Sequence, residues 1–154
     1  TEALTFADKV VVMHEGTVVQ IGTPVELFER PRHTFVGHFI GSPGMNVLPC
    51  RVEAGRVMLA EHPIVVQNPP AAAFDGRRTE IGVRPEFVRF AGDGVPVDVV
   101  KVSDAGRHRI VEARHDGGRI NVLVTEGEAM PAERACVRFD PACTRLYADG
   151  WLVE

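Results

Sequence analysis

From Met45 onward the sequence alternates between short apolar segments and clusters of turn-forming residues. β-Branched and other apolar residues dominate the segments, while Gly, Pro, Asn and Asp gather between them. Many short strands at this spacing are typical of an antiparallel sandwich or barrel. The strands expected on this basis are 46–53, 56–60, 63–67, 79–83, 87–91, 95–102, 108–115, 119–124, 135–140 and 145–148.

The segment before Met45 has a different pattern and begins with a predicted hairpin. Residues 10–13 form an apolar run, Glu15-Gly16 offers a tight turn, and residues 17–21 run back. A continuous apolar run indicates burial on both faces, which requires a larger sheet than a hairpin provides.

Two short helices are predicted after the hairpin. Thr23, Pro24 and Glu26 form a capping-box pattern, so a helix is expected through Glu29 and ends before Pro31. A second helix is expected from about Thr34, ending at Gly41, with one apolar face buried. That face contains Phe35, Val36, Phe39 and Ile40. It fits a hinge docked between two domains and an ordinary core helix equally well.

Charge and cysteine content narrow the classes of partner. A net charge of -4 gives no basic stripe of the kind that nucleic-acid backbones require, so nucleic acid is not expected as a partner. No apolar run approaches the roughly 20 residues needed to cross a bilayer. Cys50, Cys136 and Cys143 are odd in number and lack zinc-ribbon spacing, so reduced, packed cysteines are expected, with no metal.

Neither the histidines nor the carboxylates form a catalytic pattern. No two of the histidines make an i, i+4 pair on one helix face. No serine lies in a nucleophile elbow, and no spacing of Asp and Glu assigns an acid and a base. We therefore expect no catalytic, cofactor-binding or metal-binding residues in this chain.

Both ends of the sequence carry a family resemblance. Residues 7–24, 26–31 and 35–43 resemble the last part of the ATPase domain in ABC importer ATP-binding subunits. Three further motifs are similar to the maltose and glycerol-phosphate importer branch: Met45-Asn46, Gly82-Val83-Arg84-Pro85-Glu86 and Val137-Arg138-Phe139-Asp140-Pro141. The resemblance implies a mainly β chain, with an OB-fold-like antiparallel β-barrel preceded by a β-hairpin and two short helices. The implied units are 1–23, the end of an α/β ATPase domain; 24–44, a helical connector; and 45–154, the regulatory barrel.

The nucleotide-binding machinery of that family is missing from the sequence. A P-loop needs a Gly-rich turn that ends in Gly-Lys-Ser/Thr, but neither Lys9 nor Lys101 follows a glycine. The family's switch histidine would lie just before Thr1. We therefore expect a C-terminal fragment that does not bind or hydrolyse ATP, whereas the full-length parent would use ATP and Mg.

The resemblance also implies partners and a location. Two copies would form a homodimer on the cytoplasmic face of the plasma membrane, beneath permease subunits that move sugar or glycerol phosphate. The protein would then be peripheral, in contact with the membrane only through the permease. In the alternative hypothesis the barrel itself binds a small oxyanion or effector, as related domains of molybdate-type importers do. Those domains carry a Ser-Ala-Arg-Asn run, whereas residues 42–48 here lack the arginine.

Six residues are the candidates for an interface or regulatory role. They are Phe35, Phe39, Ser42, Asn46, Arg84 and Glu86. Arg84 and Glu86 fit an interface of the regulatory domain, and they also fit a local ion pair at a Pro-set corner. Because exposed pairs contribute only about 0–1 kcal/mol, stability alone is a weak reason for both charges.

Overall fold

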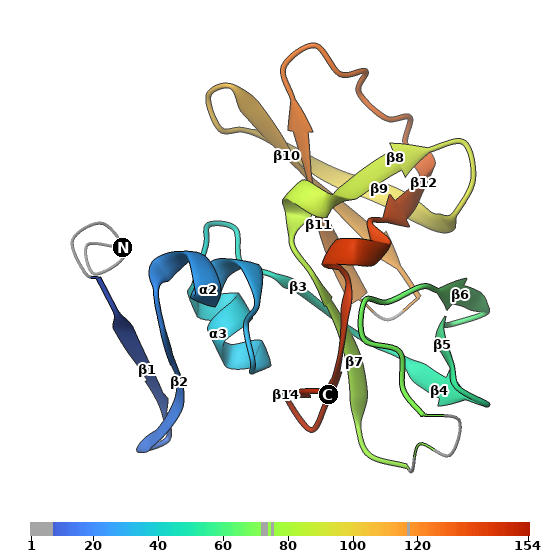
Figure 1. Cartoon of the computed structure of the whole chain (residues 1–154). Helices are drawn as coiled ribbons and strands as arrows, with labels where there is room; N and C mark the ends of the chain where they lie inside the picture. The colour runs from blue at the N-terminus through green and yellow to red at the C-terminus, as the bar shows by residue number, and fades with distance from the viewer. Residues whose placement is uncertain (1–7, 72–73, 75, 117) are drawn as a thin grey trace.

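The structure is a computed structural model that describes residues 8–71, 74, 76–116 and 118–154. Residues 1–7, the first part of the expected 1–23 unit, lie outside the described residues, as does Gly117, between the expected strands 108–115 and 119–124. The chain is mainly β with a few short helices, which confirms the expected fold class. Figure 1 shows the hairpin and two helices on one side and the larger β structure on the other.

The predicted hairpin consists of β1 (Val10–His14) and β2 (Thr17–Gly22), paired antiparallel. Glu15 and Gly16 both have positive φ angles, 51° and 77°, the backbone geometry of a tight type I′ turn. Only one face of the hairpin is covered. Val12 is 4% exposed, but Val11 and Met13 are 53% and 56% exposed, so the expected burial on both faces does not occur within the part of the chain that the structure describes.

The predicted capping box is present at the start of α2 (Pro24–Glu29). The Glu26 amide donates to the Thr23 hydroxyl at 3.2 Å, and the Thr23 amide donates to the Glu26 carboxylate at 3.3 Å. Helix α3 (Thr34–Phe39) ends with Ile40 as its C-cap, just before the expected terminator Gly41. Leu27, Val36 and Ile40 pack against the covered face of the hairpin in a small core of their own.

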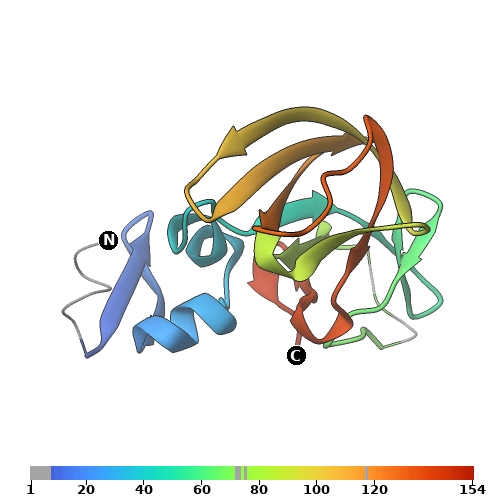
Figure 2. The same ribbon diagram turned by 90° about the horizontal axis from the view of Figure 1, so that it is seen from above.

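The remainder of the chain forms three antiparallel sheets that wrap around one apolar core (Figures 1 and 2). The first has the order β11-β10-β9-β12-β8, the second β14-β13-β7-β3 and the third β4-β5-β6. The strands are β3 (Asn46–Pro49), β4 (Arg51–Glu53), β5 (Arg56–Leu59), β6 (His62–Ile64), β7 (Thr79–Val83), β8 (Val88–Ala91), β9 (Val95–Asp104), β10 (His108–His115), β11 (Gly118–Thr125), β12 (Arg134–Phe139), β13 (Arg145–Ala148) and β14 (Trp151–Leu152). Two 3-10 turns, η1 (Pro85–Phe87) and η2 (Pro141–Cys143), connect β7 to β8 and β12 to β13.

A side-chain amide closes the barrel between β3 and β11. The Asn46 Nδ2 donates to the carbonyl of Asn121 at 2.9 Å, and the Asn121 amide donates to the Asn46 Oδ1 at 2.9 Å. This reciprocal pair imitates one rung of a β-ladder, since an Asn side chain carries the donor and the acceptor of a peptide unit. Asn46 therefore serves the barrel seam, where it is 6% exposed.

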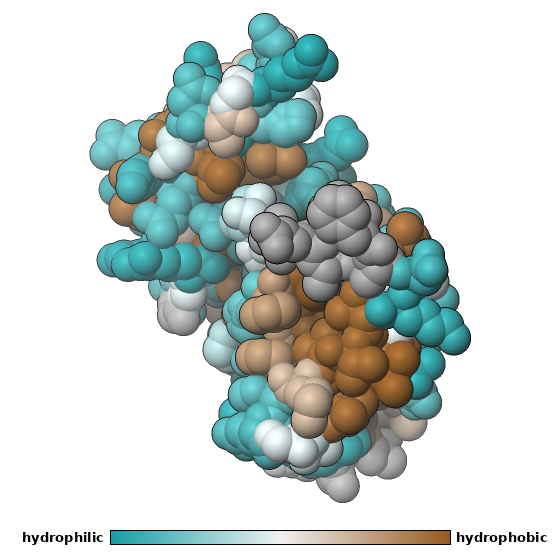
Figure 3. Space-filling model, turned by 90° about the vertical axis from the view of Figure 1, so that its left-hand side faces the viewer, coloured by the Kyte–Doolittle hydropathy of each residue, from teal (hydrophilic) through white to brown (hydrophobic). Residues whose placement is uncertain are grey.

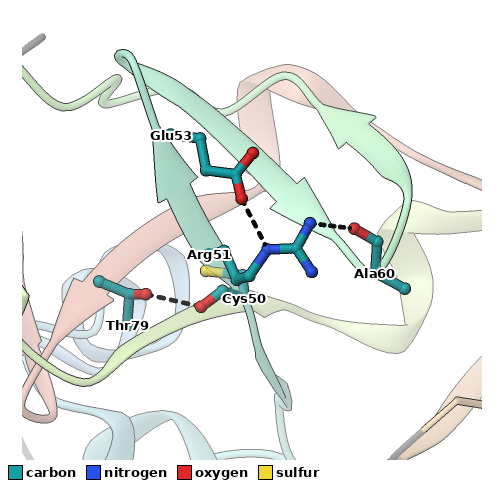
Figure 4. Close-up of polar contacts among 5 residues, drawn as sticks. All are labelled: Cys50, Arg51, Glu53, Ala60 and Thr79. Carbon is teal, nitrogen blue, oxygen red and sulfur yellow. Dashed lines mark hydrogen bonds and ion pairs between the residues drawn. The ribbon is translucent and has the colours of Figure 1, made fainter.

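The expected strand 46–53 is two strands, because the ladder breaks at Cys50. Before the break β3 pairs with β7, and beyond it β4 pairs with β5. The Thr79 hydroxyl donates to the Cys50 carbonyl at 2.7 Å and holds the corner, as Figure 4 shows. In the new sheet, Arg51 donates to the Glu53 carboxylate and to the Ala60 carbonyl, each at 3.0 Å (Figure 4).

Candidate functional site: the junction between connector and barrel

Arg84 enters the connector from the barrel side. It follows the last residue of β7 and precedes η1, where Pro85 sets the turn. Its Nε donates to the Phe28 carbonyl at 2.8 Å, and its Nη1 donates to the Ile40 carbonyl at 2.6 Å and to the Gly37 carbonyl at 3.4 Å. These carbonyls lie at the C-terminal ends of α2 and α3, where helices leave acceptors unsatisfied and favour a cation.

Burial of Arg84 overturns the expectation of a surface ion pair with Glu86. Arg84 is only 4% exposed, and no ion pair between the two residues occurs in the described part of the chain. Its guanidinium lies 4.0 Å from the centre of the Phe28 ring, a cation–π distance. Burial lowers the pKa of Arg84, and the charge of the half-buried Glu86 partly offsets this shift. Arg84 thus belongs to the interior of the junction.

Tyr147 forms a second link across the junction. It is fully buried in β13, and its hydroxyl donates to the Pro31 carbonyl at 2.6 Å. Burial raises the pKa of this hydroxyl well above its ordinary range, so it remains a donor. Beside it, Gly82 has no room for a side chain, because a Cβ there would lie 2.7 Å from Tyr147 Cε1 and from Met45 Cε. The glycine of the Gly82-to-Glu86 motif is thereby explained by close packing.

Residues 31–34 are also paired with residues 147–152, and we call this pairing the strap. The Thr34 amide donates to the Gly150 carbonyl at 2.9 Å, and the Leu152 amide donates to the Arg32 carbonyl at 2.8 Å. Gly150 has a φ of 87°, and a Cβ there would lie 2.7 Å from His33 Nε2, so this position requires glycine. The short strand β14, which the pattern of the sequence did not predict, exists because it is part of the strap.

Aromatic rings surround His33 within the strap. Its Nδ1 accepts a hydrogen bond from the Phe35 amide at 3.0 Å and caps α3. The ring meets Trp151 edge-on, with centroids 4.7 Å apart, and lies 6.0 Å from the ring of His14 in the hairpin. Burial, and after it the nearby His14 and Arg78, lower the pKa of His33, whereas Glu80 acts in the opposite direction. The cap therefore uses a neutral imidazole.

The hairpin is attached to the connector through one buried amide. Gln20 is 8% exposed; its Nε2 donates to the Arg30 carbonyl at 3.1 Å and its Oε1 accepts from the Arg32 amide at 2.9 Å. Gln20 thus joins the hairpin to the same stretch of chain that the strap joins to the barrel.

The six predicted site residues lie in separate places. Phe35 and Phe39 stack with centroids 5.7 Å apart, and Phe35 also stacks on His14 at 4.2 Å. Phe39 is 68% exposed, so it does not belong to the buried face on which the sequence pattern placed it. Ser42 is exposed, Asn46 lies in the barrel seam, and of the six only Arg84 reaches both helices of the connector.

Sequence reasoning missed three residues of the junction: Tyr147, Met45 and Gln20. The partner of Tyr147, Pro31, is 116 positions away in the sequence, and Gln20 bonds to residues 10 and 12 positions away, beyond the reach of a local pattern. Tyr147 is the only tyrosine of the chain, but a single aromatic residue in a strand pattern points equally to core packing. Among the described residues, no group of His, Cys, Asp and Glu is arranged to hold a metal ion. Within the same described ranges, no helix is both long and apolar enough to span a membrane.

Comparison with known proteins relates this chain to a family of transport proteins. Residues 41–88 match the MalK OB fold domain family. The chain matches the C-terminal OB-fold region of ABC transporter ATP-binding subunits, and its homologues include glycerol-3-phosphate import ATP-binding proteins.

Individual relatives match nearly the whole chain. It is 39% identical over 155 residues to the uncharacterized ABC transporter ATP-binding protein y4oS of Sinorhizobium fredii, with 95% of the chain and 40% of the relative covered. It is 40% identical over 129 residues to the sn-glycerol-3-phosphate import ATP-binding protein UgpC 2 of Agrobacterium fabrum, with 81% and 35% covered. For UgpC of Cereibacter sphaeroides the identity is 39% over 149 residues, with 95% and 41% covered. The chain therefore spans about two fifths of the length of these relatives.

Proposed function

We propose that this chain is the regulatory and dimerisation portion of the ATP-hydrolysing subunit of an ABC importer for sugar or glycerol phosphate. The observation that carries the proposal is the match over 95% of the chain to ABC transporter ATP-binding proteins. The parent subunit would bind ATP and Mg in its remaining length. It would act as a homodimer at the cytoplasmic face of the plasma membrane, docked beneath its permease.

The proposed division of labour follows three segments. Residues 1–23 would end the ATPase domain, 24–44 would form the connector, and 45–154 would form the regulatory barrel. The uncovered face of the hairpin supports the first assignment, since Val11, Met13 and Ile21 are each more than half exposed. Figure 3 shows the apolar area on this side of the molecule. In the parent, the sheet of the ATPase domain would cover it.

The contacts of the junction support a coupling role for the connector. Arg84 holds the ends of α2 and α3, and the strap holds the residues between them. A displacement of the hairpin would therefore be passed to the barrel as a movement of the whole connector, since buried Arg84 is bonded to both helices and the strap is bonded to the segment between them. Such coupling is what a regulatory domain needs in order to bias the equilibrium between open and closed dimers.

Phe39 offers the sharpest test of the proposed interface. In the full-length subunit assembled with its permease, Phe39→Ala should lower solute uptake per ATP hydrolysed, because this ring is 68% exposed on the connector. Val65→Ala is the matched control, since Val65 is 69% exposed on the barrel and has no predicted interface role. Equal uptake per ATP in both variants would remove Phe39 from the interface. A full-length subunit that neither hydrolyses ATP nor binds a permease would overturn the proposed function itself.

A further inference from the structure

A cavity of about 190 Å³ lies at the junction, between α2 and the barrel. Phe28 and Glu29 of the connector line one part of it, and Met45, Arg84, Phe87 and Arg145 line the barrel part. The volume exceeds that of the roughly 150 Å³ engineered cavity that admits benzene, so a small molecule fits. Unlike that apolar cavity, this one is lined by two guanidinium groups.

Both arginines have a nitrogen atom that is buried and unpaired. Within the described part of the chain, Arg84 Nη2 and Arg145 Nε have no hydrogen-bond partner. Arg84 uses Nε and Nη1 for the helix carbonyls, so Nη2 is its one remaining donor group. A buried donor without an acceptor costs free energy of folding. The cost is larger for a guanidinium, because this group stays charged. Two residues that line one cavity thus each have a buried donor without an acceptor.

Among the residues that line the cavity, the charges favour an anion as a ligand. The lining contains two arginines against a single carboxylate, that of Glu29, whose residue is exposed. Arginine pairs with oxyanions through charge-assisted hydrogen bonds, which are shorter and stronger than neutral ones. We propose that the cavity binds a small oxyanion, of the size of phosphate, between Arg84 and Arg145.

This site differs from the one that the molybdate-type resemblance suggested. Residues 42–48 contribute Asn46 to the barrel seam and contain no arginine, whereas the proposed site draws its cations from the end of β7 and the start of β13. An anion held there would connect α2 to the barrel through Arg84. The proposal concerns the chain alone and stands whether or not the parent subunit is an importer ATPase.

Calorimetric titration of the 154-residue chain with inorganic phosphate, at constant ionic strength set with sodium chloride, tests the proposal. We expect saturable binding. Arg145→Gln should weaken it at least tenfold, since a charge-assisted bond is lost. Arg138→Gln is the matched control, because Arg138 is exposed and paired with Asp93 on the surface. Glu29→Gln should tighten binding about two- to fivefold, the scale of an exposed charge interaction.

A second readout does not depend on variants of Arg84, which risk unfolding the junction. The Nε–H resonance of Arg145 should shift on addition of phosphate, and parallel titrations with sulfate and acetate would distinguish a tetrahedral from a planar oxyanion. Absence of saturable heat and of any Arg145 shift with all three anions would overturn the proposal. Equal weakening by Arg145→Gln and Arg138→Gln would overturn it as well, since it would show a diffuse ion effect.

Discussion

The hairpin and the barrel cover their apolar residues in different ways. Inside the barrel, Val111, Ile120 and Val137 are completely buried by strands of the same chain. The hairpin has one face covered by the two helices, and on its other face Val11, Met13, Val18 and Ile21 are exposed. The barrel is thus complete in itself, whereas the hairpin has the surface of a sheet from which neighbours are missing. At the junction, the barrel is bonded to the connector, which in turn covers one face of the hairpin.

Loss of Arg84 should have the largest effect on this arrangement. Arg84→Ala should lower the free energy of unfolding by about 3–5 kcal/mol, because buried carbonyl oxygens of both helices lose their donor. Urea denaturation followed by circular dichroism measures this change. Arg138→Ala, at an exposed ion pair, should cost less than about 1 kcal/mol. Similar losses in the two variants would mean that Arg84 does not hold the helices.

Acid should loosen the strap through protonation of His33. His33 must be neutral to accept from the Phe35 amide, and its pKa in the folded chain lies below the ordinary value of 6.5. The contribution of the cap is therefore complete above about pH 6.5 and is lost as the pH falls through the lower folded pKa, a loss of about 1 kcal/mol. His14 and Arg78 oppose the new charge, whereas Glu80 favours it.

Melting temperatures of wild type and His33→Asn as a function of pH measure this effect. Asparagine keeps an acceptor at the N-cap and does not titrate, so the variant should lose the acid-dependent part of the destabilisation. His38→Asn is the control, since His38 is exposed on the same helix. An unchanged pH profile in His33→Asn would contradict the assignment.

The exposed face of the hairpin should influence association more than stability. We expect the isolated chain to dimerise through this face, since apolar side chains and strand edges without neighbours invite pairing. Val11→Ser combined with Met13→Ser should make the chain monomeric and change the unfolding free energy by only about 0.5 kcal/mol, because both side chains are more than half exposed. Light scattering and urea denaturation separate the two effects. A monomeric wild type over a wide concentration range would refute pairing through the hairpin.

The smallest expected effect is the heat of ATP binding to this chain. Calorimetry with Mg-ATP should give no saturable heat, since neither lysine of the sequence is part of a P-loop. Micromolar affinity would show that one of the two regions carries a nucleotide site of a kind that the motif does not describe.

Local patterns predicted most of the fold. The capping box, the hairpin turn and nearly all the strands depend on neighbouring residues, and these were expected from the sequence. The contacts of the site were harder to predict from the sequence. Arg84 had the pattern of a surface residue because it precedes Pro85, but its acceptors Phe28 and Ile40 lie 56 and 44 positions away. Likewise the corner at Cys50 is held by Thr79, which lies 29 positions away.

The strap also sets an order of events during synthesis. Its hydrogen bonds join residues 31–34 to residues 147–152, so the connector lacks these partners until the latter have emerged from the ribosome. Domains generally fold as units during translation, N-terminal units first. Here the connector must wait for the barrel that follows it. We expect ribosome-bound chains stalled before residue 147 to leave the connector open to protease, and chains released after residue 152 to protect it.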